Sequence, residues 1–325
     1  MNKQALRQVW ADSELSDVWA TIDRNAPEAV VMRPVPSGLD APISELELDL
    51  MKRAFGGQTH GIDWENMDPE VARRWRAGMP FIGTVSWSSR SQFGGLPELP
   101  TDFEWPMGSE DYLEFVAQID LSELPEFEGR ELLPSSGVLA FFLDVACDWG
   151  EFDLPVACHY FADPGVLRRV GRHPRVRDPF DVEVWARDSG ADLLDPDTQA
   201  IPPARLAMQP VVSIPGVNER MGWEGGDHSR QQLFDALEDI PDDRLDELSD
   251  WLLDNGPTPD LQLLGEPNPI QGAVLDANSG ERLLLQISTV DPYTWGDEGR
   301  VYIIAKLEDL HNHRFDGVRA TWDGG

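Results

Sequence analysis

The chain has 325 residues, 41% of them hydrophobic, which is enough apolar material for a large core and excludes a disordered protein. Fifty-nine acidic and 26 basic residues leave a formal net charge of −33, so the surface repels nucleic acid and anionic membranes and attracts cationic partners. No apolar run approaches the roughly 20 residues of a membrane-spanning helix, and the N-terminus lacks a signal-peptide core. We therefore expect a cytoplasmic protein with neither a membrane nor a nucleic-acid partner.

The first 80 residues are predicted to be mainly helical. Apolar residues recur at the spacing of a helix face in three segments, 6–19, 43–55 and 68–78. A short extended piece at 29–36 follows the first of them. We expect residues 1–80 to pack as a helical N-terminal layer on the main domain, residues 81–325, which gives an α+β fold class.

From residue 91 a strand pattern begins, and it occurs twice, near 91–144 and near 264–310. Each copy has a loop with glycine and proline, a strand with a central glutamine, a glycine turn and a second strand, and we expect the two strands to pair as a hairpin. Gln118 and Gln286 hold equivalent places. In the first copy, alternation predicts one shared apolar face made of Leu113, Phe115, Ala117, Ile119 and Leu121.

Between the copies the pattern is less regular. Strands are predicted at 156–161, 181–186 and 207–214. One basic island consists of Arg168, Arg169, Arg172, His173, Arg175 and Arg177. It could bind an anion, but an arginine row in an acidic protein more often pairs with carboxylates on neighbouring strands.

The segment from 229 to 255 is predicted to be helical and is the most acidic part of the chain. A solvated helix face would explain its charge. Alternatively, carboxylates fixed on a helix form a pattern that a basic partner can recognise. The candidate partner-binding residues are Asp239, Asp242, Asp243, Asp246, Glu247 and Asp250.

Several motifs, in their order along the chain, resemble the YwqG-like family of bacterial proteins. They are Gly94-Gly95-Leu96-Pro97, Trp105-Pro106, Ala117 to Leu121, Gly137 to Phe142, Pro269-Ile270-Gln271, Leu285-Gln286-Ile287, Trp295 to Gly299 and Asp309-Leu310. The resemblance implies a duplicated α+β fold of bacterial, cytoplasmic origin. The family has no established reaction. Some members lie beside secreted toxin genes, which implies an immunity or partner-binding role.

The search for catalytic constellations is negative. The sequence has no nucleophile elbow, no zinc-protease helix motif and no phosphate or dinucleotide loop. Cys147 and Cys158 match no zinc spacing, and His311-Asn312-His313 is better explained as a surface turn. We predict no catalytic residue, no metal and no cofactor.

A ligand cleft between the two repeats is the remaining candidate site. If both repeats face one cleft, the amides of Gln118 and Gln286 could bind a polar ligand or a peptide backbone. The candidate residues are Gly94, Gly95, Gln118, Gln271, Gln286, Trp295 and Asp297. The alternative is that each amide bonds backbone groups of its own repeat, because buried polar groups are nearly always internally satisfied.

Two classes of function follow. The first is a non-catalytic, acidic binding protein of immunity or regulatory type that docks a basic protein. The second is a carboxylate-dependent hydrolase acting on a glycan or another polar substrate, with some of the 12 tryptophans stacking on sugar rings. No spacing of acidic residues selects a catalytic pair, so we favour the first class.

Overall fold

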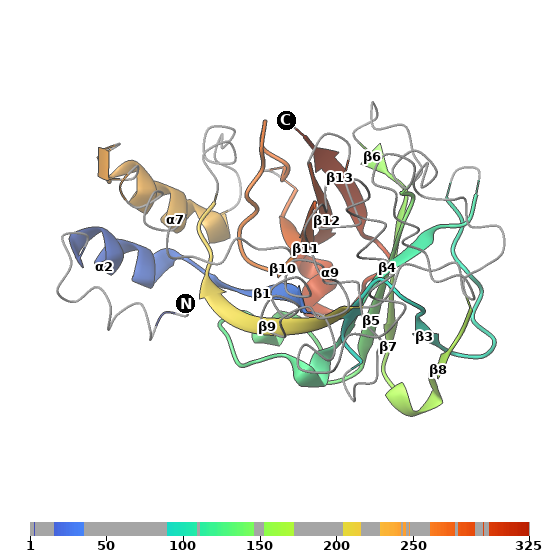
Figure 1. Ribbon diagram of the computed structural model, residues 1–325. Helices are drawn as coiled ribbons and strands as arrows, with labels where there is room; N and C mark the ends of the chain where they lie inside the picture. The colour runs from blue at the N-terminus through green and yellow to red at the C-terminus, as the bar shows by residue number, and fades with distance from the viewer. Residues whose placement is uncertain are drawn as a thin grey trace, which may run out of the picture.

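The computed structural model describes Lys3 and residues 16–35, 90–108, 111–145, 153–171, 204–215, 228–241, 243, 244, 247, 261–276, 279–289, 295 and 299–324. An antiparallel sheet of eleven strands dominates these residues (Figure 1). In spatial order the strands are β6 (Asp153–Leu154), β13 (Arg319–Asp323), β12 (Arg300–Lys306), β11 (Glu281–Ser288), β10 (Leu261–Leu263), β1 (Glu28–Val35), β9 (Ala204–Val212), β2 (Gln92–Phe93), β4 (Glu114–Asp120), β5 (Val138–Leu143) and β7 (Val156–Phe161).

The predicted α+β class with a helical N-terminal layer is wrong, because the structure is mostly β and its sheet nearly closes on itself. The segment interpreted as a short extended piece is β1, which lies at the centre of the sheet between β9 and β10. Strand β1 is apolar on both sides of its alternation, as in a strand covered on both faces. The helices predicted at 43–55 and 68–78 lie outside the described residues.

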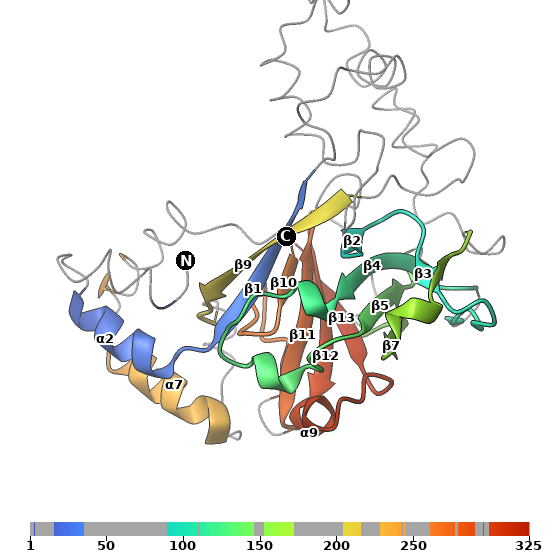
Figure 2. The ribbon, with the colours of Figure 1, turned by 90° about the horizontal axis from the view of Figure 1, so that it is seen from below.

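The longer helices lie beside the sheet. Helix α2 (Ser16–Asn25) leads into β1 and contacts α7 (His228–Glu238). Figures 1 and 2 both show this pair next to one end of β1 and β9, away from the strands β4 to β7. Within the described residues, no helix has the length and apolarity needed to cross a bilayer.

The remaining described elements are short. A separate two-stranded sheet pairs β3 (Glu98–Leu99) with β8 (Arg168–Arg169). The 3-10 turns η1 (Leu121–Glu123), η2 (Arg130–Leu132) and η3 (Pro164–Val166) and the helix α9 (Leu307–His311) lie in connections. The strands predicted at 156–161 and 207–214 are confirmed as β7 and most of β9; the strand predicted at 181–186 lies outside the described residues.

The two edges of the eleven-stranded sheet are consecutive in the sequence. Strand β6 pairs with β13 at one edge, the chain passes Pro155, and β7 then pairs with β5 at the other edge. The sheet is therefore curled into a nearly closed, barrel-like form (Figure 2). Pro155 joins its two edges.

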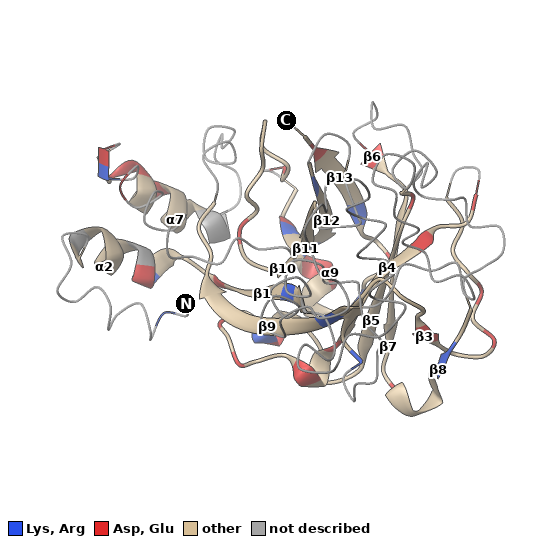
Figure 3. Ribbon diagram, viewed as in Figure 1, with Lys and Arg blue, Asp and Glu red and all other residues tan. Residues whose placement is uncertain are grey.

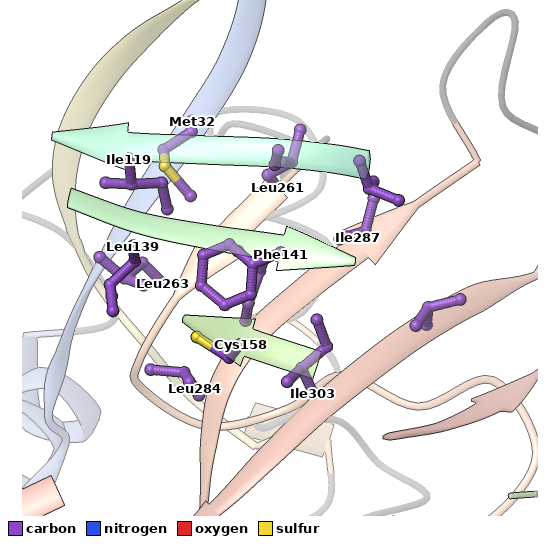
Figure 4. Close-up of a cluster of buried hydrophobic side chains, with 14 of the residues drawn as sticks. Met32, Ile119, Leu139, Phe141, Cys158, Leu261, Leu263, Leu284, Ile287 and Ile303 are labelled. Atoms are coloured by element: carbon purple, nitrogen blue, oxygen red, sulfur yellow. The ribbon is translucent and has the colours of Figure 1, made fainter. Parts of the chain in front are cut away.

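The main core fills the inside of the curled sheet. Side chains from both ends of the strand order meet there, including Met32 of β1, Ile119 of β4, Phe141 of β5, Cys158 of β7 and Ile303 of β12 (Figure 4). Burial raises the pKa of the Cys158 thiol, so the thiol is protonated and acts as a core side chain.

The predicted shared face of the strand at 113–121 is also wrong. Phe115 is opposite Phe142, but Ala117 is opposite Phe141, so Val116 forms a bulge. Leu113 and Phe115 therefore pack in a second cluster on the outer face, while Ala117, Ile119 and Leu121 face the main core. A bulge adds one residue and reverses the alternation, which period-two counting cannot detect.

The strand register relates two halves of the sheet. Arg33 of β1 is opposite Ala207 of β9. Two residues before Arg33, Val31 pairs with Gln209, and two residues before Ala207, Arg205 pairs with Val35, so rotation by 180° about the Arg33–Ala207 pair exchanges the two strands. We call β9, β2, β4, β5 and β7 unit A, and β1, β10, β11, β12 and β13 unit B. The antiparallel β1–β9 pair joins the two units across an approximate two-fold axis.

Candidate functional site

Unit A has a strap, residues 94–105, that crosses the outer face of its strands. Gln92 and Gln118 are cross-strand neighbours and both are buried. The Gln92 Nε2 donates to the carbonyl of Leu96 at 2.8 Å, and the Gln118 Oε1 accepts from the amide of Glu98 at 2.9 Å. The Gln118 Nε2 donates to the carbonyl of Arg90 at 3.2 Å. Side-chain amides of the sheet therefore hold the backbone of the strap.

Unit B has the same arrangement in residues 264–271, its own strap. Gln262 and Gln286 are cross-strand neighbours. The Gln262 Nε2 donates to the carbonyl of Glu266 at 2.8 Å, and the Gln286 Oε1 accepts from the amide of Asn268 at 3.1 Å. Gln262 therefore corresponds to Gln92, and Gln286 to Gln118.

Both straps leave the sheet through a left-handed turn. Gly94 and Gly95 have φ of 68° and 74°, and Leu264 and Gly265 have 57° and 77°. The first backbone N–H of each turn donates to the carbonyl of the bulged residue in the neighbouring strand. Gly94 donates to Val116 of β4 at 2.7 Å, and Leu264 donates to Leu284 of β11 at 3.1 Å. A Cβ on Gly265 would lie 2.6 Å from the Ala29 Cβ, so only glycine fits there.

The structure does not bring Gln118 and Gln286 into one cleft. Four strands separate β4 from β11, and both glutamines point to the outer face of the sheet, opposite to the core residues on either side of them. For Gln118, the alternative expectation is confirmed, because both ends of its amide bond to the backbone of its own unit. The Gln286 Nε2 differs: it is buried and has no hydrogen-bond partner among the described residues.

The other predicted ligand residues in unit B have structural contacts. The backbone N–H of Gln271 donates to the Asp323 Oδ2 at 3.0 Å. Trp295 is fully buried, and its Nε1 donates to the carbonyl of Ser288 at 2.9 Å, which anchors the connection between β11 and β12. Asp297 lies outside the described residues.

Beneath its strap, unit A carries an aromatic cluster. Phe103 of the strap lies with its ring centroid 4.9 Å from His159 and 5.8 Å from Phe142 and Phe161. The His159 Nε2 is buried, and no group in the described part of the chain bonds to it. Burial lowers the pKa of this imidazole, so it is neutral at physiological pH.

Beneath its strap, unit B carries polar contacts at the equivalent places. The Tyr302 hydroxyl donates to the Asp323 Oδ1 at 2.8 Å, and Asp323 Oδ2 accepts from the amide of Ile270 at 2.6 Å. Burial and the Asp323 charge raise the pKa of Tyr302. The Arg319 guanidinium binds Glu281 through two contacts of 2.6 and 2.7 Å. These groups tie β13 and the strap to the sheet.

The acidic segment 235–250 begins on α7. The apolar side of α7 is buried through Leu233, Phe234 and Leu237, and α2 packs beside it. The described carboxylates of the segment are all exposed: Asp235, Glu238, Asp239, Asp243 and Glu247. Arg244 forms an ion pair with Glu247. The candidate residues Asp242, Asp246 and Asp250 lie outside the described residues.

Part of the basic island is described. Arg168 and Arg169 form β8, which pairs with β3 so that Arg169 is opposite Glu98. The Arg168 guanidinium donates to the carbonyl of Gly165 at 2.8 Å. The island residues from Arg172 onward lie outside the described residues.

The structure adds Gln92, Gln262 and Asp323 to the residues that hold the straps. Gln92 precedes Gly94-Gly95 at the same spacing as Gln262 precedes Leu264-Gly265. Alignment of the two repeats could therefore have found this glutamine pair. Asp323 has no such signal, because Phe161 of β7 holds the equivalent place in unit A.

The fold and the straps define a duplicated, antiparallel β protein whose two units hold their straps by buried glutamines. The chain belongs to the family described as "Domain of unknown function (DUF1963)", whose model matches residues 91–324. A search of curated proteins found no match to the chain.

Proposed function

We propose that the protein is a non-catalytic binding protein whose acidic segment 235–250 docks a basic partner protein. The observation that carries the proposal is the row of exposed carboxylates on and after α7 (Figure 3). Because the apolar side of α7 is buried, Asp235 and Glu238 project from a fixed helix face, an arrangement that a partner can recognise. The net charge of −33 adds long-range attraction for a cationic protein.

The finer assignment is part of the same proposal. The order of motifs supports a YwqG-like protein of bacterial, cytoplasmic origin, and an immunity or regulatory role fits a protein that binds another protein. We do not carry the hydrolase alternative further, because the half-buried Glu281 and the buried Asp323 both serve to hold strands and strap together.

The test separates the position of the charges from their number. Protein captured from host lysate at low and high salt is compared for the wild type, the variant Glu238→Lys/Asp239→Lys/Asp243→Lys, and a control with equal net charge, Asp102→Lys/Glu126→Lys/Glu131→Lys. All six carboxylates are exposed. We expect a basic protein that binds the wild type and the control, leaves at high salt, and is lost from the α7 variant.

The opposite result would be equal capture. If the α7 variant, Glu238→Lys/Asp239→Lys/Asp243→Lys, and the control capture the same proteins in the same amounts, the acidic segment has no specific role. Net charge alone would then explain any capture, and the proposal would be abandoned.

A further inference from the structure

Within the described residues, the edge strand β7 has a row of backbone hydrogen-bonding groups that pairs with no other strand. The Asp144 amide donates to the Pro155 carbonyl at 2.9 Å, which fixes the phase of the ladder between β5 and β7. In an antiparallel ladder, alternate residues direct both N–H and C=O to the partner strand, and the residues between them direct both groups away. Ala157, His159 and Phe161 therefore bond to β5, while Val156, Cys158 and Tyr160 present their backbone groups at the open edge.

Nothing in the described part of the chain pairs with this open edge. If the pairing of β6 with β13 continued past Pro155, β7 would be opposite the connection 315–318, which precedes β13. No backbone hydrogen bond joins this connection to β7. Contact is made by side chains, with the rings of Tyr160 and Phe315 5.7 Å apart. The two sheet edges therefore meet at Pro155 and separate from there.

Strand β7 also lacks the features that usually protect an edge. Its sequence, Val-Ala-Cys-His-Tyr-Phe, has no lysine, no acidic residue and no proline. The equivalent strand of unit B, β13, is protected: β6 covers Ala320 and Thr321, and Arg319 and Asp323 are charged. The edge of unit A is thus open where that of unit B is closed.

The charges around β7 indicate what could occupy the edge. Exposed carboxylates lie just before and just after the strand, at Asp153 and Asp163. The edge itself is apolar and uncharged (Figure 3). An added strand with an apolar centre and basic ends would match this pattern, whereas a second copy of a chain with net charge −33 would be repelled.

We propose that β7 binds an extended segment of a basic partner by strand addition, with the segment pairing to Val156, Cys158 and Tyr160. The identity of the partner as a basic protein rests on the proposed function above, but the site is a different one. The acidic segment would speed encounter, and β7 would supply the directional contacts.

The probe is a fluorescent peptide of alternating valine and threonine with two lysines at each end, titrated with the full chain at low salt. We expect binding by the wild type and loss of binding when alternate peptide nitrogens are N-methylated, because methylation removes the donors that strand pairing needs. Since this comparison leaves the protein unchanged, it does not depend on how any variant folds. Equal binding of the two peptides would overturn the proposal.

Two protein variants locate the peptide. Val156→Pro removes an outward N–H without removing a bond to β5, and we expect at least tenfold weaker binding. Asp153→Lys/Asp163→Lys should weaken binding several-fold. Unchanged affinity in Val156→Pro, with wild-type thermal unfolding, would contradict strand addition at β7.

The α7 variant keeps this result separate from the proposed function. Glu238→Lys/Asp239→Lys/Asp243→Lys should leave the peptide affinity within about twofold after correction for net charge. If this variant loses the captured protein but still binds the peptide, the result supports both proposals. If it keeps both the captured protein and the peptide, the result contradicts only the acidic-segment proposal. A dimer in sedimentation that Val156→Pro abolishes would show that a second copy occupies the edge, which overturns the basic-partner assignment.

Discussion

Units A and B have the same backbone framework and different chemistry beneath their straps. In each, two buried glutamines hold the strap, a left-handed turn begins it, and a bulge receives its first amide. Beneath the strap, however, Phe161 of unit A is replaced by Asp323 of unit B, and Ala157 by Arg319. The backbone contacts are thus repeated while the side chains they enclose differ.

The difference shows which residues the framework requires. A strap backbone needs an amide side chain below it, because its N–H and C=O groups are cut off from water. Beneath that backbone, an aromatic cluster and a bonded polar set are both acceptable solutions, since each leaves few unsatisfied groups. The four predictions below probe this division, beginning with the framework.

The largest effect is expected at the turn of unit B. Gly265→Ala places a Cβ 2.6 Å from both the Ala29 Cβ and the Ser213 Oγ, at a φ of 77°. We expect a loss of about 3 kcal/mol in the free energy of unfolding, from backbone strain and overpacking together. Urea denaturation measures it. Gly272→Ala, with open space around the new Cβ, is the control and should change stability by less than about 0.5 kcal/mol.

The glutamines come next, and here the units should differ. Gln118→Ala frees both the Arg90 carbonyl and the Glu98 amide, which should cost about 2–3 kcal/mol. Gln286→Ala frees only the Asn268 amide and also removes a buried donor that bonds to no described residue, so we expect a loss of about 1 kcal/mol. Equal losses in urea denaturation would show that the two amides are equally bonded.

The ion pair of unit B should give an effect that depends on pH. Burial acts to raise the pKa of Glu281, but hydrogen bonds from Arg319 and the Asp276 amide outweigh it, and the folded-state pKa is lowered from 4.5. Its contribution is therefore present above the unfolded pKa and is lost as the pH falls through the lower folded value. Glu281→Gln should cost about 1–2 kcal/mol at pH 7 and progressively less below about pH 4.5.

The control for this measurement is Glu131→Gln, because Glu131 is exposed on η2. Its stability should follow the wild type at every pH. A Glu281→Gln loss that stayed constant from pH 7 to pH 3 would contradict the charge-based explanation.

The smallest effect is expected at His159 in unit A, whose counterpart in unit B is Thr321. Burial lowers the pKa of His159 from 6.5, so the unfolded chain binds a proton that the folded chain does not. The wild type should therefore lose stability as the pH falls below about 6.5, and His159→Phe should lose less. Thermal unfolding at pH 8 and pH 5 measures this, and His311→Gln is the control, because His311 is exposed at the end of α9. A variant with an unaltered pH profile would contradict it.

Much of the local structure could be predicted from the sequence. The hairpins around Gln118 and Gln286 depend on residues close together in the chain, and the structure contains them. The fold class could not be predicted in this way. It depends on β1 pairing with β9 and β10, and local periodicity carries no information on pairing across so many residues.

The candidate site was predicted only in part. Gln118 and Gln286 were found from the repeat, but their separation by four strands follows from the strand order. The open edge of β7 is a property of the same order. Its sequence predicts a strand correctly, yet whether that strand is central or at an edge is decided by the other strands.

The position of β1 has a consequence for synthesis on the ribosome. This strand leaves the ribosome early, whereas β9 and β10, its two neighbours, are made much later. Strands β2, β4, β5 and β7 are close together in the chain and can pair first. Strand β1 stays unpaired until both of its partners have been synthesised. An apolar strand that remains exposed and unpaired is the kind of segment that chaperones bind. Productive folding of this protein should therefore be most sensitive to chaperone supply before β10 has emerged.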